Sequence, residues 1–443
     1  MKQISKIPVD DTSCQGAGGS SESATSGVAP EVAVALLTGG GDRPYVFGLT
    51  TELLSKGAAV DLIGSDQLDG PEFKNKAGLN FFNLRGDQRP DADFLSKVLR
   101  VARYYFKLFR YAATAKPKIF HILWNNKIES LDRTLLMLYY KALGKRIVLT
   151  AHNVNQAKRD CNDTPLNRLT LRIQYRLADH LFVHTEKMKL ELIEEFGVRR
   201  TRITVIPFGI NNAAPNTSLT SRDARRRLGI RDGEKTILFF GTITPYKGLE
   251  YLIEAFKQIH ADTADYRLIV AGRLKDCEDY WGPIREAMQN GVESGRILVN
   301  ASFISDEQTE VYFKAADVLV LPYRHVYQSG VMFLGYSFGL PVLAADVGSL
   351  KEEVIEGRTG YMFRSEDPAE LASAIKRYFS SDLFADLDSR RQDIRDIAAK
   401  RHSWDVVGEA TMNIYARLLQ LPSPREASKN EASNASLDVK ASS

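Results

Sequence analysis

The chain carries four consecutive residues whose types and position suit anion binding. They are Tyr327, Gln328, Ser329 and Gly330. They precede an apolar run that predicts a helix over 330–338, which Pro341 prevents from continuing, and then a strand over 342–345. First-turn amides of a helix lack intrahelical partners and the helix dipole is positive there, so such an entry can hold a phosphate. An ordinary strand–loop–helix–strand unit of a parallel sheet accounts for the same pattern.

A lysine stands at a similar place earlier in the chain. Lys247 follows the apolar run 236–240 and a short loop, and it precedes a helix that begins near Leu249. The pattern therefore predicts a cation at the carboxyl end of a strand. A cation there can neutralise the charge of a diphosphate leaving group.

A glycine loop and a histidine are the corresponding features of the N-terminal half. The run Val32–Leu37 ends in Gly39, Gly40 and Gly41, which would let a ligand approach the backbone closely, although a tight turn without a ligand explains them equally well. The loop is not G-x-G-x-x-G, so a dinucleotide site is not favoured. His152 follows the run 146–150, where it can hydrogen-bond a hydroxyl or handle a proton; a structural histidine is the alternative. We interpret His121, His184 and His325 as structural.

These residues must be positioned by strands that alternate with helices. Runs rich in β-branched and aromatic residues occur at 32–37, 59–63, 81–84, 119–123, 146–150, 181–184 and 203–206, and again at 236–240, 266–270, 297–300, 318–321 and 342–345. A polar connection over 211–232 separates the two groups. We therefore predict an α/β protein made of two Rossmann-like, doubly wound parallel-sheet domains that face each other across a cleft, where ligands should bind.

Composition excludes several classes of protein. The chain has 443 residues, 44% of them hydrophobic and 26% charged, and a formal charge of +4, which is too small to indicate a nucleic-acid partner. Its three cysteines are widely separated, which argues against disulfides and a zinc site. The apolar runs are too short to span a membrane, and the N-terminus lacks a secretory signal, so we expect a cytoplasmic protein. Residues 1–29 and 422–443 are predicted to be disordered tails.

Three segments resemble the family 4 (group 1) glycosyltransferases: FFGTITPYKGLEYLIEAF at 239–256, ADVLVLPY at 316–323 and FGLPVLAADVGSLKEEVIEGRTGYMF at 338–363. The resemblance implies the GT-B fold, with an acceptor domain over 30–212 and a nucleotide-sugar donor domain over 213–402. A last helix over 403–421 would cross back to the first domain. It also implies that His152 lines the reaction centre, that Lys247 holds the donor diphosphate, and that the glycine loop, with Gly40 and Gly41, lies near the donor phosphates and the acceptor.

The chain departs from the family pattern at two motifs. Thr242 stands where the family has an arginine beside the lysine, and Val326 and Leu334 stand at the two glutamates of E-x₇-E. The chain resembles a branch that carries Gln-Ser-Gly at this place together with F-G-x-I-x-P-Y-K-G. The resemblance then implies donor contacts from Gln328, Ser329 and the amides of 329–331, including Gly330 and Val331, with Thr242 donating one hydrogen bond. Arg273, after the strand 266–270, is a candidate replacement for the missing arginine, or simply a solvated side chain.

The resemblance implies a hexosyltransferase that uses a nucleotide sugar and a saccharide or lipid-linked acceptor, with retention of configuration and without a metal ion, in cell-surface polysaccharide or glycolipid synthesis. A retaining enzyme needs no tuned protein base if the leaving phosphate accepts the proton. Two alternatives stay open. One is an inactive GT-B protein that binds sugar nucleotides or glycans, which the missing arginine and glutamates favour, and the other is a two-lobed sugar-nucleotide epimerase.

The segment 91–114 predicts a helix with a basic side and an apolar side. The basic residues are Lys97, Arg100, Arg103, Lys107 and Arg110, and the apolar ones are Phe94, Val98, Val101, Ala102, Tyr105, Phe106 and Phe109. Such a helix can lie against an anionic bilayer, at the inner face of the membrane, and this would suit a lipid-linked acceptor. Alternatively its apolar side packs inward and its basic side is solvated.

Overall fold

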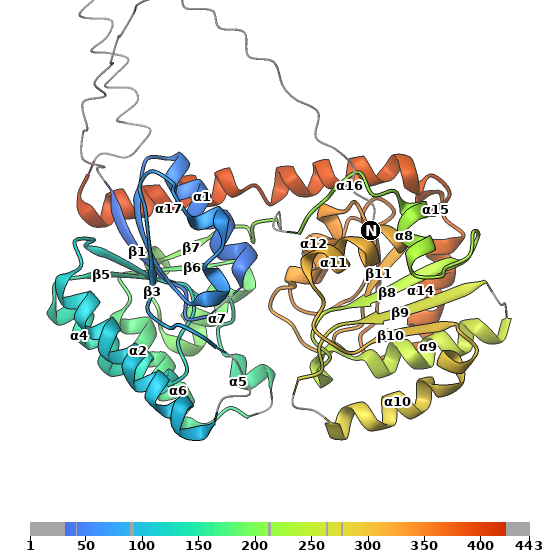
Figure 1. Cartoon of the computed structure of the whole chain (residues 1–443), viewed down its shortest axis with the longest axis horizontal. Helices are drawn as coiled ribbons and strands as arrows, with labels where there is room; N and C mark the ends of the chain where they lie inside the picture. The colour runs from blue at the N-terminus through green and yellow to red at the C-terminus, as the bar shows by residue number, and fades with distance from the viewer. Residues whose placement is uncertain are drawn as a thin grey trace, which may run out of the picture.

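The computed structural model describes residues 32–421, except for 41, 89–92, 161, 211–213, 263–264 and 276–277. Within this part the chain forms two lobes, each built on a parallel sheet with helices on both sides (Figure 1). The predicted tails, all three cysteines and Gly41 lie outside the described residues. The predicted fold class is confirmed.

The first lobe contains a seven-stranded sheet in the order β3-β2-β1-β4-β5-β6-β7. The strands are β1 Ala33–Leu37, β2 Ala59–Gly64, β3 Leu79–Asn83, β4 Ile119–Ile122, β5 Arg146–Thr150, β6 His180–Val183 and β7 Ile203–Val205. The helices are α1 Arg43–Ser55, α2 Phe94–Thr114, α3 Glu129–Leu131, α4 Met137–Ala142, α5 Gln156–Arg159, α6 Pro165–Leu177 and α7 Glu186–Phe196. A π-helical segment, η3 Asp132–Leu136, joins α3 to α4.

The second lobe repeats this plan with six parallel strands in the order β10-β9-β8-β11-β12-β13. The strands are β8 Lys235–Phe240, β9 Tyr266–Ala271, β10 Ile297–Asn300, β11 Val318–Leu321, β12 Val342–Ala345 and β13 Gly360–Phe363. The helices are α8 Ser221–Arg227, α9 Leu249–Asp262, α10 Glu278–Glu293, α11 Asp306–Ala315, α12 Gly330–Ser337, α13 Leu350–Glu353, α14 Pro368–Phe379, α15 Asp382–Ala385 and α16 Leu387–Arg401.

Strand order reverses at one point in each sheet, between β1 and β4 in the first and between β8 and β11 in the second. At such a switch point the two loops at the carboxyl ends of the strands part and leave a crevice, where ligands of open α/β sheets bind. The glycine loop follows β1 and the loop carrying Lys247 follows β8. The sheet topology therefore places both predicted loops at switch points.

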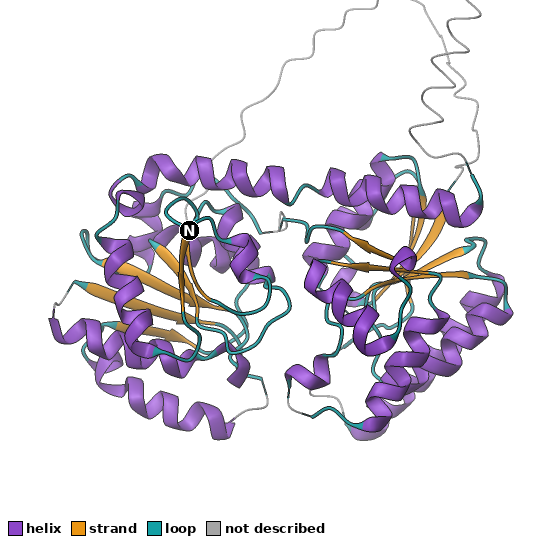
Figure 2. Ribbon diagram, turned by 180° about the vertical axis from the view of Figure 1, so that it is seen from behind, coloured by secondary structure: helices purple, strands orange, loops and turns teal. Residues whose placement is uncertain are grey.

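The last two helices join the lobes along one side, as Figures 1 and 2 show from opposite directions. α16 packs in the second lobe against α12, and α17 Trp404–Leu419 packs on α1 of the first. The Trp404 indole donates a 2.9 Å hydrogen bond to the Ile210 carbonyl and lies against Gly48 and Gly209 so closely that a Cβ at either glycine would overlap it. Glycine at these two positions lets α17 dock on the first lobe.

Helix α2 buries only part of the apolar side that we predicted. Phe94, Val98, Ala102 and Phe106 are exposed, Phe94 by 77% and Phe106 by 70%. The buried side is Tyr104, Tyr105, Leu108, Tyr111 and Ala112. Of the residues that we placed on the apolar side, Tyr105 is buried, and Val101 and Phe109 pack partly buried against the core. The apolar arc is wider than the strip that one lobe can cover, so the rest of it stays at the surface. The predicted start of the helix at 91–92 lies outside the described residues.

Candidate functional site

Lys247 lies in a hollow of about 280 Å³ that residues of both lobes line. We call it the Lys247 hollow; its lining is Asp42, Tyr246, Lys247, Tyr323, Val326, Gln328, Ser329, Gly330, Val331 and Leu334. Asp42 belongs to the first lobe and the others to the second. The hollow thus brings Lys247 together with the 328–331 segment and includes Asp42 from the loop that follows β1.

The Lys247 side chain is held in place from two sides. It is only 6% exposed, and its Nζ lies 5.6 Å from the centre of the Tyr323 ring, a cation–π contact. A side chain at Gly241, where φ is +100°, would crowd Nζ, so glycine at this position makes room for the ammonium group. The arrangement directs one buried positive charge at the hollow.

The entry of α12 forms the opposite wall. Ser329 caps the helix, since its hydroxyl accepts from the Met332 amide at 3.3 Å. Both amide atoms of the Gln328 side chain are buried, and neither has a hydrogen-bond partner among the described residues. An unpartnered buried amide is costly, so a side chain in this state indicates a place where a ligand supplies the missing partners.

Asp42 is a residue of this site that sequence reasoning missed. Its carboxylate lies close to Gly330, 3.9 Å from where a Cβ there would stand, and it shares the hollow with Lys247. Asp42 is exposed as a whole residue, but the protein atoms around its carboxyl group partly desolvate it and raise its pKa above the usual range, and a hydrogen bond from the Tyr45 backbone opposes this rise. Its position directly after the glycine loop was a signal that we did not use.

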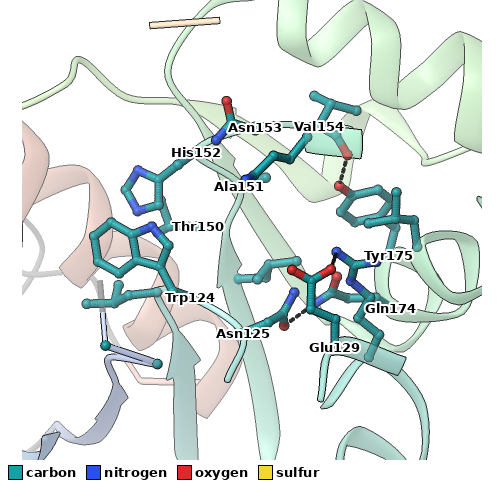
Figure 3. Close-up of a pocket in the computed structure, with 17 residues that line it drawn as sticks. Trp124, Asn125, Glu129, Thr150, Ala151, His152, Asn153, Val154, Gln174 and Tyr175 are labelled. Carbon is teal, nitrogen blue, oxygen red and sulfur yellow. Dashed lines mark hydrogen bonds and ion pairs between the residues drawn. The ribbon is translucent and has the colours of Figure 1, made fainter. Parts of the chain in front are cut away.

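A second cavity, of about 210 Å³, lies in the first lobe at the carboxyl ends of β1, β4 and β5 (Figure 3). We call it the His152 pocket. It is lined by Gly39, Gly40, Leu123, Trp124, Asn125, Glu129, Arg133, Leu149, Thr150, Ala151, His152, Asn153, Val154, Gln156, Leu171, Gln174 and Tyr175. The Gln174 amide donates to Asn125 Oδ1 at 2.7 Å, and charged and polar side chains such as Glu129 line the pocket together with aromatic and aliphatic ones.

His152 is enclosed by aromatic rings. The Trp124 indole stacks on it at 4.1 Å and Tyr45 meets it edge-on at 4.6 Å. Its Nδ1 lies 3.0 Å from Nε2 of His184, and its Nε2 is buried with no partner among the described residues. Burial, and then the charges of His184 and His121, hold the pKa of His152 well below its usual value. The imidazole is therefore neutral at physiological pH.

The π-helical segment η3 orders the loop that carries Trp124 and Asn125. Buried Asp132 accepts hydrogen bonds from the Tyr105 hydroxyl at 2.9 Å and from the Asn126 amide nitrogen at 2.7 Å. Arg133, the next residue, pairs with Glu129 at the pocket wall. The extra residue of a π-turn thus lets Asp132 face the loop while Arg133 faces the pocket.

The Lys247 hollow and the His152 pocket adjoin. Phe208 lies between them, stacked on Phe333 of α12 at 5.5 Å and 6.1 Å from the His152 ring. The Phe208 ring therefore lies between the first turn of α12 and the imidazole of the first lobe. The lobes also meet at the 325–329 loop, where the Tyr327 hydroxyl donates to Glu191 of α7 at 2.8 Å.

Comparison with known proteins assigns the family. The model of Glycosyltransferase Family 4 matches residues 39–213, and that of Glycosyl transferases group 1 matches residues 234–381, so each lobe is matched by one. The chain is a family 4 glycosyltransferase. An uncharacterized glycosyltransferase of Methanocaldococcus jannaschii is 25% identical over 392 residues, which is 86% of this chain and 95% of that protein.

Solved structures support the fold of this glycosyltransferase. Sucrose-phosphate synthase from Thermosynechococcus elongatus superposes with a TM-score of 0.68 at 18% identity. The match spans 88% of this chain and 99% of the synthase chain. HepE from Anabaena, in complex with UDP and glucose, superposes with a TM-score of 0.65 at 17% identity. The match spans 88% of this chain and 100% of the HepE chain. The predicted GT-B fold and glycosyltransferase family are thereby confirmed.

The residues that we expected to replace family motifs do not all lie at the hollow. Val326 and Leu334, which the resemblance places at the two glutamates, both line the Lys247 hollow. Thr242 and Arg273 are not among its lining residues, and the Arg273 side chain is exposed, although its backbone carbonyl accepts from Ile243 in the loop after β8. The donor contacts predicted for Thr242 and Arg273 therefore stay predictions. Among the described residues, no helix is long and apolar enough to cross a bilayer.

Proposed function

We propose that the enzyme transfers a hexose from a nucleotide-sugar donor, held in the Lys247 hollow, to a saccharide or lipid-linked acceptor held in the His152 pocket. The observation that carries the proposal is the buried ammonium group of Lys247 opposite the first turn of α12. A cation and free helix amides on two sides suit a diphosphate. The Anabaena relative, whose structure holds UDP and glucose, makes a UDP-hexose the first donor to test.

The proposed reaction retains configuration and uses no metal ion. Lys247 and the first-turn amides, including those of Gly330 and Val331, would stabilise the charge that develops on the diphosphate. The acceptor proton would pass to the leaving phosphate, so the protein contributes position and charge. Gln328 and Asp42 would bond donor hydroxyls in place of the two glutamates, and neutral His152 would accept from a sugar hydroxyl through Nε2.

The first experiment asks whether Lys247 binds a donor. Purified enzyme is screened against UDP-, ADP- and GDP-sugars by thermal shift, since a ligand at 100 times its Kd stabilises a protein by roughly 2.7 kcal/mol. We expect one class to stabilise the enzyme, and Lys247→Ala to abolish that shift and the donor-dependent release of nucleotide. Lys257→Ala is the matched control, because Lys257 is half-exposed on the same lobe and pairs with Glu254. Unchanged nucleotide release by Lys247→Ala would refute the diphosphate site.

We further propose that the surface around α2 contacts an anionic membrane, where a lipid-linked acceptor would reside. Nine exposed large hydrophobic side chains belong to α2 and to the neighbouring η3, α4 and α6. They are Phe94, Leu95, Val98, Leu99, Phe106, Leu135, Leu138, Leu166 and Leu169. Arg103, Lys107 and Arg110 lie exposed on the same α2. Apolar side chains that insert, beside cations that attract anionic lipid, fit a bilayer surface.

Flotation with vesicles tests this membrane contact. We expect binding to vesicles that contain phosphatidylglycerol, and none to phosphatidylcholine alone. Phe94→Ser with Leu99→Ser should lower binding at least tenfold, whereas Leu190→Ser with Val292→Ser, which are exposed on α7 and α10, should not. Equal binding by the two double variants would refute the contact.

A further inference from the structure

We propose that Glu129 in the His152 pocket binds a hydroxyl group of the acceptor, and that the pocket selects a neutral sugar over one that carries a carboxylate or a phosphate. The proposal rests on the proposed function, because it takes the ligand of this pocket to be the acceptor. Figure 3 shows His152 on one side of the pocket and Glu129 on the other, with Gln174 and Tyr175 on the same side as Glu129. A carboxylate and an imidazole therefore line one cavity.

The Glu129 carboxylate is held at one oxygen and open to a ligand at the other. Its Oε2 pairs with Nη2 of Arg133, one helical turn later, and Nη1 of Arg133 donates to Asn167 Oδ1 at 2.7 Å. Arg133 is only 7% exposed, so these two bonds fix the guanidinium group and, through it, the carboxylate. The Glu129 side chain is 53% exposed, and its Oε1 has no hydrogen-bond partner among the described residues. That oxygen is an oriented, charged acceptor for a hydroxyl.

The polar groups of the pocket include both hydrogen-bond donors and acceptors. Asn125 Oδ1 accepts from the Gln174 amide at 2.7 Å, which leaves Asn125 Nδ2 as a donor without a partner in the described part of the chain. Glu129 Oε1 and Nε2 of neutral His152, which also lacks a partner there, are acceptors. A sugar hydroxyl both donates and accepts, whereas the oxygens of an ionised carboxylate or phosphate only accept. An anionic group would therefore leave Glu129 and His152 without donors.

The charge of the pocket also favours a neutral ligand. Of the described residues that line it, Glu129 and Arg133 are the only two that carry a charge, and they neutralise each other. An anion would have to give up its hydration beside the Glu129 carboxylate without gaining an uncompensated cation. An anion that took Arg133 as its partner would place a second negative charge next to Glu129. A neutral hydroxyl group meets neither penalty.

The pocket has room for a ligand much larger than a water, and its wall is fixed before a ligand binds. It encloses about 210 Å³, whereas one water needs roughly 10–15 Å³. Gly39 packs so closely on the Trp124 and Asn125 carbonyl oxygens that a Cβ there would overlap both. The glycine loop thus holds the segment that carries Asn125, as the ion pair holds Glu129. Groups whose positions are set in advance favour selectivity.

Binding of methyl glycosides tests the site. The probes are the methyl glycosides of glucose, galactose and mannose, with methyl glucuronide and glucose 6-phosphate as acidic counterparts, and saturation-transfer NMR measures their Kd. We expect at least one neutral glycoside to bind and to change the tryptophan fluorescence, and Trp124→Phe to abolish that change. Glu129→Gln should raise the Kd at least tenfold. Glu186→Gln is the matched control and should leave the Kd unchanged, because Glu186 is 63% exposed and pairs with Lys189 on α7, outside the pocket.

Three results would overturn the proposal. The first is that no neutral glycoside binds. The second is that Glu129→Gln and Glu186→Gln have equal Kd values for the glycoside, since glutamine at position 129 keeps an oxygen for Arg133 and removes only the charge. The third is that an acidic sugar binds as tightly as its neutral counterpart.

Deoxy glycosides give a second test, which begins with the unchanged enzyme. Each lacks one hydroxyl of the methyl glycoside that binds best. For one of them we expect the Kd of the wild type to rise at least tenfold and the Kd of Glu129→Gln to rise less than threefold, because the variant has already lost the charged hydrogen bond. Equal losses in the two enzymes for every analogue would show that Glu129 only holds the pocket together, and would overturn the proposal.

The donor screen separates this site from the proposed function. If a nucleotide sugar shifts the unfolding temperature through Lys247 but Glu129→Gln leaves glycoside binding unchanged, the proposed function stands and the sugar site fails. If glycoside binding depends on Glu129 and no nucleotide sugar binds, the proposed function fails and the sugar site stands.

Discussion

Nε2 of His184 lies 3.0 Å from Nδ1 of His152, and this contact determines which nitrogen of His152 is left for a substrate. The Ile206 carbonyl, which can only accept, lies 3.3 Å from Nδ1 of His184, so that nitrogen carries the proton. Nε2 of His184 must then accept from Nδ1 of His152. Because both rings are neutral, Nε2 of His152 is an acceptor, ready for a hydroxyl donor.

We therefore expect His184 to act as a positioning residue. His184→Leu removes the acceptor that holds His152 in this tautomer, and the loss of one hydrogen bond, about 1–1.5 kcal/mol, should lower kcat roughly tenfold with little change in KM. His184→Gln keeps an oxygen that can accept and should restore most of the activity. The ¹⁵N shifts of His152 report the tautomer directly. A leucine variant with normal kcat and an unchanged tautomer would contradict this role.

We expect Gln328 to lower the stability of the ligand-free enzyme and to strengthen its binding of the nucleotide sugar. Its buried amide atoms lack partners, so replacing it with a leucine of similar volume removes polar groups whose burial costs about 1–3 kcal/mol. We expect Gln328→Leu to unfold at a higher temperature than the wild type in the absence of ligand, and to bind the nucleotide sugar at least tenfold more weakly. Calorimetry measures both quantities. If the variant loses stability instead, the amide has a partner within the protein and no donor role need be invoked.

Gly48 should tolerate substitution by alanine less well than Gly282 does. Both lie inside helices, where alanine is usually more stable than glycine by about 1 kcal/mol. At Gly48 a methyl group would overlap the Trp404 indole, and overpacking costs about 1–3 kcal/mol. At Gly282 a methyl group meets open space except for Pro283, the next residue, whose ring opposes a helical residue with a Cβ before it. Urea unfolding should therefore show Gly48→Ala to be less stable than the wild type and less stable than Gly282→Ala. A Gly48→Ala enzyme as stable as the wild type would show that α17 moves aside easily.

Strand positions could be read from the sequence because buried parallel strands are short β-branched runs between helices. β5, β10, β11 and β12 begin and end at the predicted residues, and Lys247 and Gln328 lie together as their places after β8 and β11 imply. β13 was not predicted, because Gly360–Phe363 follows the turn-forming Gly357-Arg358-Thr359 and alternates too briefly to stand out.

Contacts between distant segments could not be read in the same way. His184 looked structural because nothing in its neighbourhood along the chain shows that β5 and β6 are adjacent and bring it to His152. Asp42 follows a glycine loop, yet its approach to Gly330 depends on how the two lobes meet. The Arg85 guanidinium lies directly behind Gly40, and this contact likewise depends on β3 and β1 lying in the same sheet.

Stability should fall as the pH is lowered from 7 to 5, in part because of His121. Burial lowers its pKa to about 3, and its two nitrogens meet the Tyr415 hydroxyl at 2.6 Å and the Thr150 hydroxyl at 2.7 Å. An unfolded histidine titrates near 6.5, so below that pH the unfolded chain binds a proton that the folded one does not. Above about pH 6.5 His121 therefore does not reduce the free energy of unfolding. Below that pH the free energy of unfolding falls, and at pH 5 His121 has lowered it by roughly 2 kcal/mol.

The slope of unfolding free energy against pH isolates this contribution. His121→Asn will lower stability at every pH, since it disturbs the contact between β4 and α17, but it should flatten the slope between pH 7 and 5 by the amount due to one proton. His325→Asn, at an exposed side chain, is the matched control for the loss of one histidine. Urea titrations at intervals of half a pH unit give the slopes. If the wild type and His121→Asn have parallel slopes, His121 is protonated in the folded enzyme and its ring accepts from neither hydroxyl.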